Sequence, residues 1–396
     1  MTATNGMISV LRQPTRFVND KRVHEWVAQG VVLLFIVGLF AYFAQNAVFN
    51  VAREGGKWGF GFLGERAGVD IGFKLIEYTP NSTYARLLLV GIVNTLFVSL
   101  VGIVLATVLG FAIGIGRLSQ NWLLARLCGA FVEIVRNIPL LLFVLAWYFA
   151  VIAALPPPRN SFSLLDSFFL NNRGVFFPSP QEWDALLAVP IALLLGTIIA
   201  WAIAWWARRR QTRTGSTFPV FTSSLLLVVG FPLLTAIAVG LNIAWDRPVL
   251  RGFGVRGGGA LPPEFLALLA ALVTYTAGFI AEIIRAGILS VAAGQREAAA
   301  ALGLNRRQIL RLVIVPQAMR VIIPPLTSQY VNLLKNSSYA AVIAYPEIVS
   351  VFVGSALNNT GRAVEIIAIT LGIYLAMNLA VSASMNWYNA RVAISR

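Results

Sequence analysis

The stretch Glu297-Ala298-Ala299, followed by Gly303 and then by Val313-Ile314-Val315-Pro316, is a patterned hydrophilic segment set between two apolar runs. Residues 295–302 are rich in Ala, Glu, Arg and Leu, all of which favour a helix. Gly303 follows directly, where a residue of left-handed conformation would end that helix. The pattern predicts a short helix that stops at a glycine.

A second helix is predicted to start immediately after this glycine. Asn305 is a good N-cap, and Gln308 three residues later completes a variant of the capping box. Pro316 is expected to stop this helix or to bend it into the next apolar run. The segment carries one acid, Glu297, and four bases: Arg296, Arg306, Arg307 and Arg311. Such an element needs a surface to dock on, either a protein or the anionic lipid of a membrane.

Composition assigns the chain to the integral membrane proteins. Of its 396 residues 58% are hydrophobic and only 12% are charged, and the mean hydropathy is +0.76. A membrane-crossing helix needs about 20 apolar residues. Runs of this kind predict an all-α fold of about eight spans: 26–52, 87–116, 137–158, 185–207, 214–245, 263–287, 317–345 and 366–390.

The distribution of Lys and Arg predicts the orientation. With both termini in the cytoplasm, the inner segments hold 19 basic and 4 acidic residues, and the outer segments hold 11 of each. The net charge of +15 therefore lies on one face of the membrane. A basic inner face is typical of such proteins, so the charge gives no reason to expect a nucleic-acid partner.

Catalytic and metal-binding chemistry has few candidate residues. The chain holds one cysteine, Cys128, and one histidine, His24, which leaves no metal-ligand set. The fragment Gly56-Lys57 lacks the glycine and the hydroxyl residue that a phosphate-binding loop requires. The sequence therefore predicts a protein that is not an enzyme and holds no cofactor of its own.

The chain divides into three predicted parts. Residues 1–83 give a cytoplasmic leader, the first span and an outer loop. Residues 84–388 form the transmembrane domain, with a core of 84–156 and 262–388 and an inserted two-span hairpin at 157–261. Residues 389–396 are a cytoplasmic tail. The sequence does not explain the purpose of the hairpin.

Polar residues inside or next to spans are candidates for a substrate pathway, because an ionisable group in hydrocarbon must be paired or face water. Glu133 with Arg136, and Glu282 with Arg285, are each three residues apart and can neutralise one another. Lys335 either lines the pathway or pairs with Glu282. The uncharged candidates are Asn94, Thr274, Thr276 and Asn336, which can contact a zwitterion or hold helices together.

Three segments carry a resemblance to a known family. The spacing of Glu297-Ala298-Ala299, Gly303 and Val313-x-Val315-Pro316 resembles the EAA loop of ABC-importer permeases, with Val at two positions where that pattern has Ile and Leu. Residues 133–141 and 333–338 resemble two further segments of the polar amino-acid permeases, the histidine, glutamate and glutamine type. The insertion is similar to that of the larger permease subunits of general L-amino-acid and acidic amino-acid importers.

This resemblance implies a type I importer core in the bacterial inner membrane and a set of partners. A second permease subunit completes the pathway, and the resemblance to the larger permeases favours an unlike partner, which would make a heterodimer. A cytoplasmic ATPase dimer binds ATP and magnesium, and a periplasmic binding protein delivers an amino acid. Glu297 would anchor the ATPase, Ala298 and Ala299 would allow close approach, Gly303 would set the helix angle and Pro316 the return to the membrane. The rival interpretation is an ion-coupled secondary transporter, although no inverted repeat is detectable. The identity of the amino acid stays open.

Overall fold

The computed structural model describes residues 21–53, 59–181, 187–216, 218–252 and 254–393. Residues 1–20 of the expected leader and residues 394–396 of the expected tail lie outside this range. The long helices are α2 (Lys21–Arg53), α3 (Tyr84–Gly116), α6 (Ala188–Thr214), α9 (Pro263–Leu289), α12 (Val315–Asn336) and α14 (Ala363–Ala393). The shorter ones are η1 (Phe60–Gly64), α4 (Trp122–Asn137), α5 (Leu140–Ala154), η2 (Pro158–Asn160), α7 (Val220–Leu225), η4 (Leu226–Gly230), α8 (Phe231–Asn242), α10 (Ala293–Ala301), α11 (Arg306–Gln308), η5 (Ile309–Ile314), η6 (Ser337–Ile343), η7 (Val349–Ala356) and α13 (Leu357–Thr360).

Seven helical segments in the described part of the chain are long and apolar enough to cross a membrane. The pair α4 and α5, bent by 111° at Ile138-Pro139, makes an eighth when it is counted as one broken span. The predicted helical membrane fold of about eight spans is confirmed. The expected span at 137–158 is shorter than predicted, because Pro139 separates α5 from a helix that replaces the expected connecting segment.

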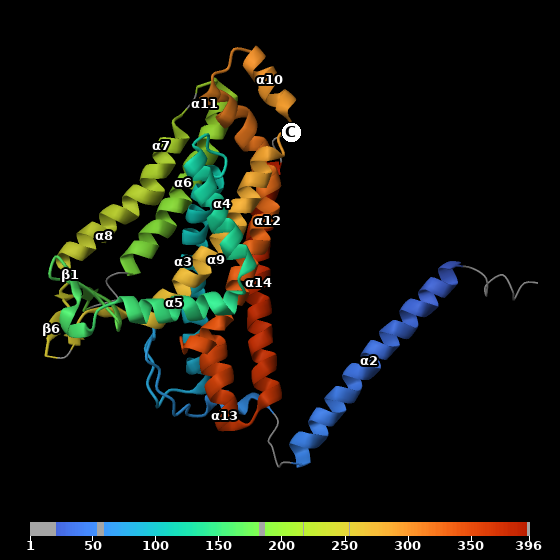
Figure 1. Ribbon diagram of the computed structural model, residues 1–396, viewed down its shortest axis with the longest axis vertical. Coiled ribbons are helices and arrows are strands. Elements are labelled where there is room, and N and C mark those ends of the chain that lie inside the picture. The colour runs from blue at the N-terminus through green and yellow to red at the C-terminus, as the bar shows by residue number, and fades with distance from the viewer. Residues whose placement is uncertain (1–20, 54–58, 182–186, 217, 253, 394–396) are drawn as a thin grey trace, which may run out of the picture.

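The core is built around α9, which packs against α3, α4, α5 and α12 (Figure 1). The contact with α3 depends on glycine, because a Cβ at Gly110 would lie 2.6 Å from the Ile280 side chain and one at Gly114 would lie 2.8 Å from that of Ile284. Ile280 and Ile284 are buried in the same cluster. The glycines therefore allow α3 and α9 to pack closely against each other.

A second core lies at the end of the bundle opposite α10, where η1 and η7 meet the start of α3 (Figure 1). Its fully buried members include Phe62, Leu87 and Phe352. Phe62 stacks near Phe352 with ring centroids 6.3 Å apart. This end of the molecule is closed by packed aromatic and aliphatic side chains.

One helix, α6, extends further than the sequence predicted. Helix α6 runs through the arginine cluster to Thr214 and ends at Gly215, whose φ is +69°. Arg209 lies 3.7 Å from the centre of the Trp205 ring and Arg210 lies 5.3 Å from that of Trp206. Arginine is a good helix former and these cation–π contacts hold it along the helix, so the expected loop is the last turn of α6.

Pro316 does not stop the helix that follows Gly303, although stopping it is one of the two outcomes that the sequence predicts. It sits in the first turn of α12, where its missing N–H is tolerated. The preceding turn, η5, is a π-helix, and it joins α11 to α12 without a gap. The segment after the glycine is therefore one continuous helical arm that runs into the membrane span.

The outer loops of the inserted hairpin form a small β structure that the sequence analysis did not predict. The strands are β1 (Phe162–Leu164), β2 (Phe168–Asn171), β3 (Gly174–Phe177), β4 (Ser179–Pro180), β5 (Trp245–Asp246), β6 (Val249–Arg251), β7 (Gly254–Arg256) and β8 (Gly259–Leu261). One antiparallel sheet has the order β1-β2-β3-β8, and β4 pairs with β5 and β6 with β7. The segments before α6 and after α8 are therefore hydrogen-bonded to each other.

Candidate functional site

The predicted helix-glycine-helix element is present and is held by local hydrogen bonds. Helix α10 ends at a Schellman motif, in which Leu304 N donates to Ala299 O at 3.2 Å and Gly303 N donates to Ala300 O at 2.9 Å. Gly303 has φ +78°, a backbone conformation that a side chain disfavours. The glycine is thus required by the turn and does not merely separate two helices.

The next helix begins with the complete capping box that the sequence predicted. Gln308 N donates to Asn305 Oδ1 at 2.9 Å, and Asn305 N donates to Gln308 Oε1 at 2.9 Å. Leu304 is the only residue between Gly303, which ends α10, and Asn305, which caps α11. The backbone geometry of this short turn therefore determines the angle between α10 and the helical arm that follows.

Most of the surface of α10 is left exposed by the residues that the structure describes. Glu297 and Ala298 are exposed, Ala299 is buried, and Leu302 is 81% exposed. Arg306 and Arg307 are also exposed. Figure 1 shows α10 at the extreme end of the helical body. Glu297, Ala298 and Leu302 therefore belong to an exposed surface at this end of the described protein.

The arm is tied to both the loop helix and the membrane span. Ile309 is buried, and Gln317 Nε2 donates to Gln295 Oε1 at 3.4 Å across the two helices. Pro316, one residue before this glutamine, lies in the first turn of α12. The predicted coupling residues therefore belong to one connected piece.

The charged residues beneath this element form a triad. Glu282 accepts from Arg285 Nη2 at 2.6 Å, as the spacing predicted, and also from Arg117 at the end of α3. The alternative pairing of Glu282 with Lys335 is wrong, because both carboxylate oxygens are taken by the two arginines. Sequence reasoning did not identify Arg117, because it is far from Glu282 in the chain.

The second predicted pair is not formed. Glu133 and Arg136 make no ion pair in the part of the chain that the structure describes. The Arg136 guanidinium instead lies 5.7 Å from the centre of the Phe279 ring on α9. The attraction to an aromatic face and the bend after Asn137 direct this arginine toward α9.

Two of the predicted pathway residues, Thr276 and Asn336, line one cavity of about 300 Å³ between α9 and α12. The same cavity is lined by Gln329, Asn332, Tyr275 and Phe279. Sequence reasoning did not select Gln329 or Asn332 as site residues. Their spacing with Asn336, three and four residues apart along a helix, is the signal that identifies one polar face. Lys335, next to Asn336, is exposed and forms no ion pair among the described residues.

Two other predicted pathway residues, Asn94 and Thr274, are hydrogen-bonded within the protein. Asn94 is fully buried, and its Nδ2 donates to Phe73 O at 3.2 Å and to Pro346 O at 2.8 Å. Thr274 Oγ1 donates to Ala270 O at 2.7 Å and accepts from Trp147 Nε1 at 3.2 Å. Neither residue lines the cavity of Thr276. Asn94 Nδ2 and Thr274 Oγ1 are hydrogen-bonded within the protein, so a role for these two residues in the pathway stays a prediction.

The comparisons agree with this architecture. The family model described as binding-protein-dependent transport system inner membrane component matches residues 188–394. The general L-amino acid transport system permease protein AapQ of Rhizobium johnstonii is 48% identical over 375 residues, which is 95% of this chain and 94% of that protein. The glutamate/glutamine/aspartate/asparagine transport system permease protein BztB of Rhodobacter capsulatus is 38% identical over 408 residues, 95% of each chain.

These relatives confirm the resemblance to amino-acid ABC permeases that was predicted from the loop motif. They give no support to the ion-coupled alternative. A permease of this kind works with an ATPase and other subunits, and the apolar helices make this chain a multi-pass membrane protein. The chain belongs to the family of binding-protein-dependent transport system inner membrane components.

Proposed function

We propose that this chain is the non-catalytic membrane subunit of an ATP-driven importer for L-amino acids, and that α10 docks on a separate cytoplasmic ATPase. The observation that carries the proposal is the combination of α10, whose C-terminal end is fixed by the turn at Gly303, with a surface that the described residues leave exposed. In this role Glu297 contacts the ATPase, with Ala298 and the buried Ala299 permitting close approach. Gly303 fixes the angle, and Arg306 and Arg307 add positive charge beside the docking surface.

The route from the ATPase to the substrate is a continuous helix. A movement of α10 passes through the Gly303 joint into α11, η5 and α12, because no break interrupts the arm up to Asn336. Pro316 lies at the point where the arm enters the span. Gln329, Asn332 and Asn336, on the same helix, line the polar cavity. Closure of the partner ATPase on ATP would therefore change the position of these amides relative to Thr276 on α9.

The polar cavity is suited to a small zwitterion. Its amide and hydroxyl groups can hydrogen-bond both an ammonium and a carboxylate, and about 300 Å³ is at the small end of ligand pockets. Tyr275 and Phe279 supply an apolar wall. The names of the relatives, which transport L-amino acids, favour the same class of substrate. Thr276 and Asn336 are the proposed contacts; Lys335, Glu133 and Arg136 are candidates for the mouth of the pathway.

The remaining assignments follow from charge and from family membership. The α10 end and both termini face the cytoplasm of the bacterial inner membrane, as the excess of Lys and Arg indicates. The importer comprises a second, unlike permease subunit, an ATPase dimer that binds ATP and magnesium, and a periplasmic amino-acid-binding protein. Residues 1–83, the core of 84–156 and 262–388, the inserted hairpin 157–261 and the tail 389–396 are the proposed divisions.

The proposal is tested by reconstituting the complete importer in vesicles and measuring uptake of labelled amino acids. Uptake is expected to require ATP and the binding protein, and Glu297→Lys and Gly303→Pro are expected to abolish it while the chain still assembles in the membrane. The control is Arg311→Gln, a charge change outside α10 that should transport normally. Uphill uptake driven by an ion gradient alone would reject the proposal, and so would normal uptake by both variants.

The substrate assignment has a separate test. Asn336→Leu and Thr276→Val should each raise the substrate concentration needed for half-maximal uptake by about tenfold, because a buried hydrogen bond to a charged group is lost. Ser338→Ala, two residues from Asn336 and outside the cavity, is the matched control. Unchanged apparent affinity in both cavity variants would remove the cavity from the pathway and leave the docking proposal standing.

A further inference from the structure

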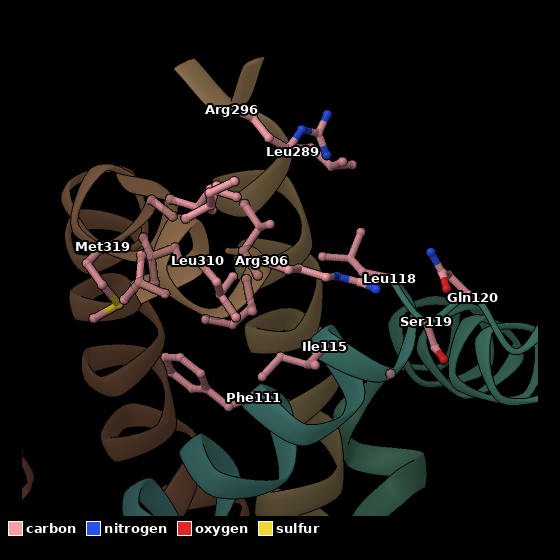
Figure 2. Close-up of a pocket in the computed structure, with 18 of the residues that line it drawn as sticks. Phe111, Ile115, Leu118, Ser119, Gln120, Leu289, Arg296, Arg306, Leu310 and Met319 are labelled. Carbon is pink, nitrogen blue, oxygen red and sulfur yellow. The ribbon is translucent and has the colours of Figure 1, made fainter. Parts of the chain in front are cut away.

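A large apolar cavity lies between the coupling element and the ends of the membrane helices. Its volume is about 870 Å³, and it is enclosed by the last turns of α3 and α9, by η5 and by the start of α12. Apolar side chains form most of the wall, among them Phe111, Ile115, Leu310 and Met319 (Figure 2). The cavity lies at the ends of two candidate membrane spans, α3 and α9.

The cavity has a positively charged rim. Arg296 of α10 and Arg306 of α11 both line it, and no acidic residue does. Neither arginine forms a salt bridge or an aromatic contact within the described ranges, whereas Arg117 and Arg285 are both paired with Glu282. Figure 2 shows Arg306 extending toward Leu118 and Arg296 beside Leu289, so both arginines lie at the cavity.

A ligand for this site must satisfy both features at once. A free inorganic anion would pair with the arginines but leave the apolar wall uncovered, and a neutral lipid would fill the wall but leave two cations unpaired. An anionic phospholipid presents a phosphodiester to the rim and an acyl chain to the interior. Basic pockets at the cytoplasmic side of membrane helices suit such headgroups, and each buried CH₂ group of the acyl chain adds to the affinity.

We infer that this cavity is a binding site for an anionic phospholipid of the inner leaflet, with its phosphate on Arg296 and Arg306 and one acyl chain against Phe111, Ile115 and Met319. The inference goes beyond the proposed function and rests only on its orientation, which places the cavity at the cytoplasmic leaflet. The bound lipid contacts α10, the arm and α3 together. It therefore fills the space between the docking helix and the spans that this helix is proposed to move.

The test is native mass spectrometry of the detergent-purified full-length protein with its partner subunits, titrated with phosphatidylglycerol or with phosphatidylcholine. The wild-type protein should retain one phosphatidylglycerol per copy of this chain in preference to phosphatidylcholine. The double variant Arg296→Gln/Arg306→Gln should weaken phosphatidylglycerol binding at least tenfold. The double variant Arg307→Gln/Arg311→Gln removes the same charge from residues that do not line the cavity, and it should bind as the wild type does.

A second pair of variants tests the apolar half of the site without changing charge. Leu310→Trp narrows the cavity and should also weaken binding about tenfold, whereas Leu312→Trp, which lies outside the cavity, should not. Equal binding by both double variants would overturn the inference. Displacement of the lipid by an equal concentration of glycerol 3-phosphate would also overturn it, because the acyl chain would then contribute nothing. So would loss of the bound lipid whenever the ATPase is present, because the partner would then be the occupant. Loss of lipid binding in Leu310→Trp with ATP-dependent uptake retained would support the inference and leave the proposed function intact.

Discussion

The two ends of the helical body are held in opposite ways. At one end, α10 and α11 are fixed by bonds between near neighbours, such as Gln308 N to Asn305 Oδ1 at 2.9 Å. At the other end, the turn before η7 is fixed by bonds to a distant helix. Tyr345 OH donates to the Asn94 backbone carbonyl at 3.2 Å, and Ile348 N donates to Thr95 Oγ1 at 3.3 Å. The first end is exposed and the second is buried.

The difference indicates which end can move. An element held by its own caps keeps its shape when it is pushed, and its exposed surface is free to follow a partner. The turn before η7 is hydrogen-bonded to α3 inside the protein and cannot shift without breaking those bonds. Each broken bond leaves a buried polar group without a partner, which costs free energy. We therefore expect substitutions at the η7 end, around the turn before η7, to reduce stability. Substitutions at the α10 end, in α10 and α11, should reduce transport.

The largest effect on stability is expected for Asn94→Leu. The substitution leaves the carbonyls of Phe73 and Pro346 without their donor, at about 1–3 kcal/mol for each buried group, so the unfolding free energy should fall by about 2–6 kcal/mol. Thermal unfolding in detergent measures the change. Asn358→Leu, which removes one amide bond to Gly354 at an exposed position, should change stability little. Equal melting temperatures for the two variants would contradict the contrast.

The η7 end of the molecule should also lose stability as the pH rises. Burial raises the pKa of Glu347 from 4.5 to about 7, although Val349 N, Ser350 N and the Tyr374 hydroxyl donate to its carboxylate. The folded protein therefore binds this proton more tightly than the unfolded chain. The stabilisation is complete below pH 4.5 and is lost as the pH passes through 7, by at most about 3 kcal/mol.

Melting temperatures at pH 5.5 and 8.5 test this dependence. The wild-type protein should melt at a lower temperature at pH 8.5, and Glu347→Gln should reduce the difference because it cannot ionise. A difference of the same size in the variant would assign the effect to other groups.

The same substitution at two glycines of the coupling region should have opposite effects. Gly303→Ala forces a side chain into φ +78° and should destabilise the local structure by about 1–2 kcal/mol. Gly294→Ala lies within α10, where no atom is close to the added carbon, and it should stabilise the helix by up to about 1 kcal/mol. Amide hydrogen exchange of residues 293–301 reports both changes. Faster exchange in both variants, or in neither, would show that the turn does not control α10.

The smallest effect is expected for Asn305→Ala. Loss of an N-cap typically costs about 1 kcal/mol, and only the first turn of the arm depends on it. Uptake should fall severalfold while the melting temperature of the whole protein stays within about a degree. A large drop in melting temperature would mean that the α10 end is not independent of the body.

The predictability of each region follows the same division. The caps at Gly303 and Asn305 were predictable because their partners lie within five residues. Glu282 and Arg285 were predictable as neighbours on a helix, but Arg117 was not, because its contact depends on how α3 packs on α9. Glu133 and Arg136 had the same spacing and do not pair, since Arg136 is drawn to Phe279.

Tertiary contacts also explain what the sequence analysis missed. The hydrogen-bond partners of Asn94 at Phe73 and Pro346 were invisible from its surroundings in the chain. The sheet of the insertion was missed because its strands are three or four residues long and β3 pairs with β8, which follows α8 in the chain. Strands this short show no useful alternation of polar and apolar residues.

The most direct test of the docking assignment uses two leucines of equal exposure at different ends of the molecule. Leu302 beside α10 and Leu165 in the outer β1–β2 turn are each 81% exposed. A photoreactive phenylalanine derivative is placed at one or the other position, and the assembled importer is irradiated and analysed for cross-linked subunits. We predict a cross-link to the ATPase from position 302 and none from position 165. No ATPase cross-link from position 302, or an equal yield from both positions, would contradict the assignment of α10 as the docking helix.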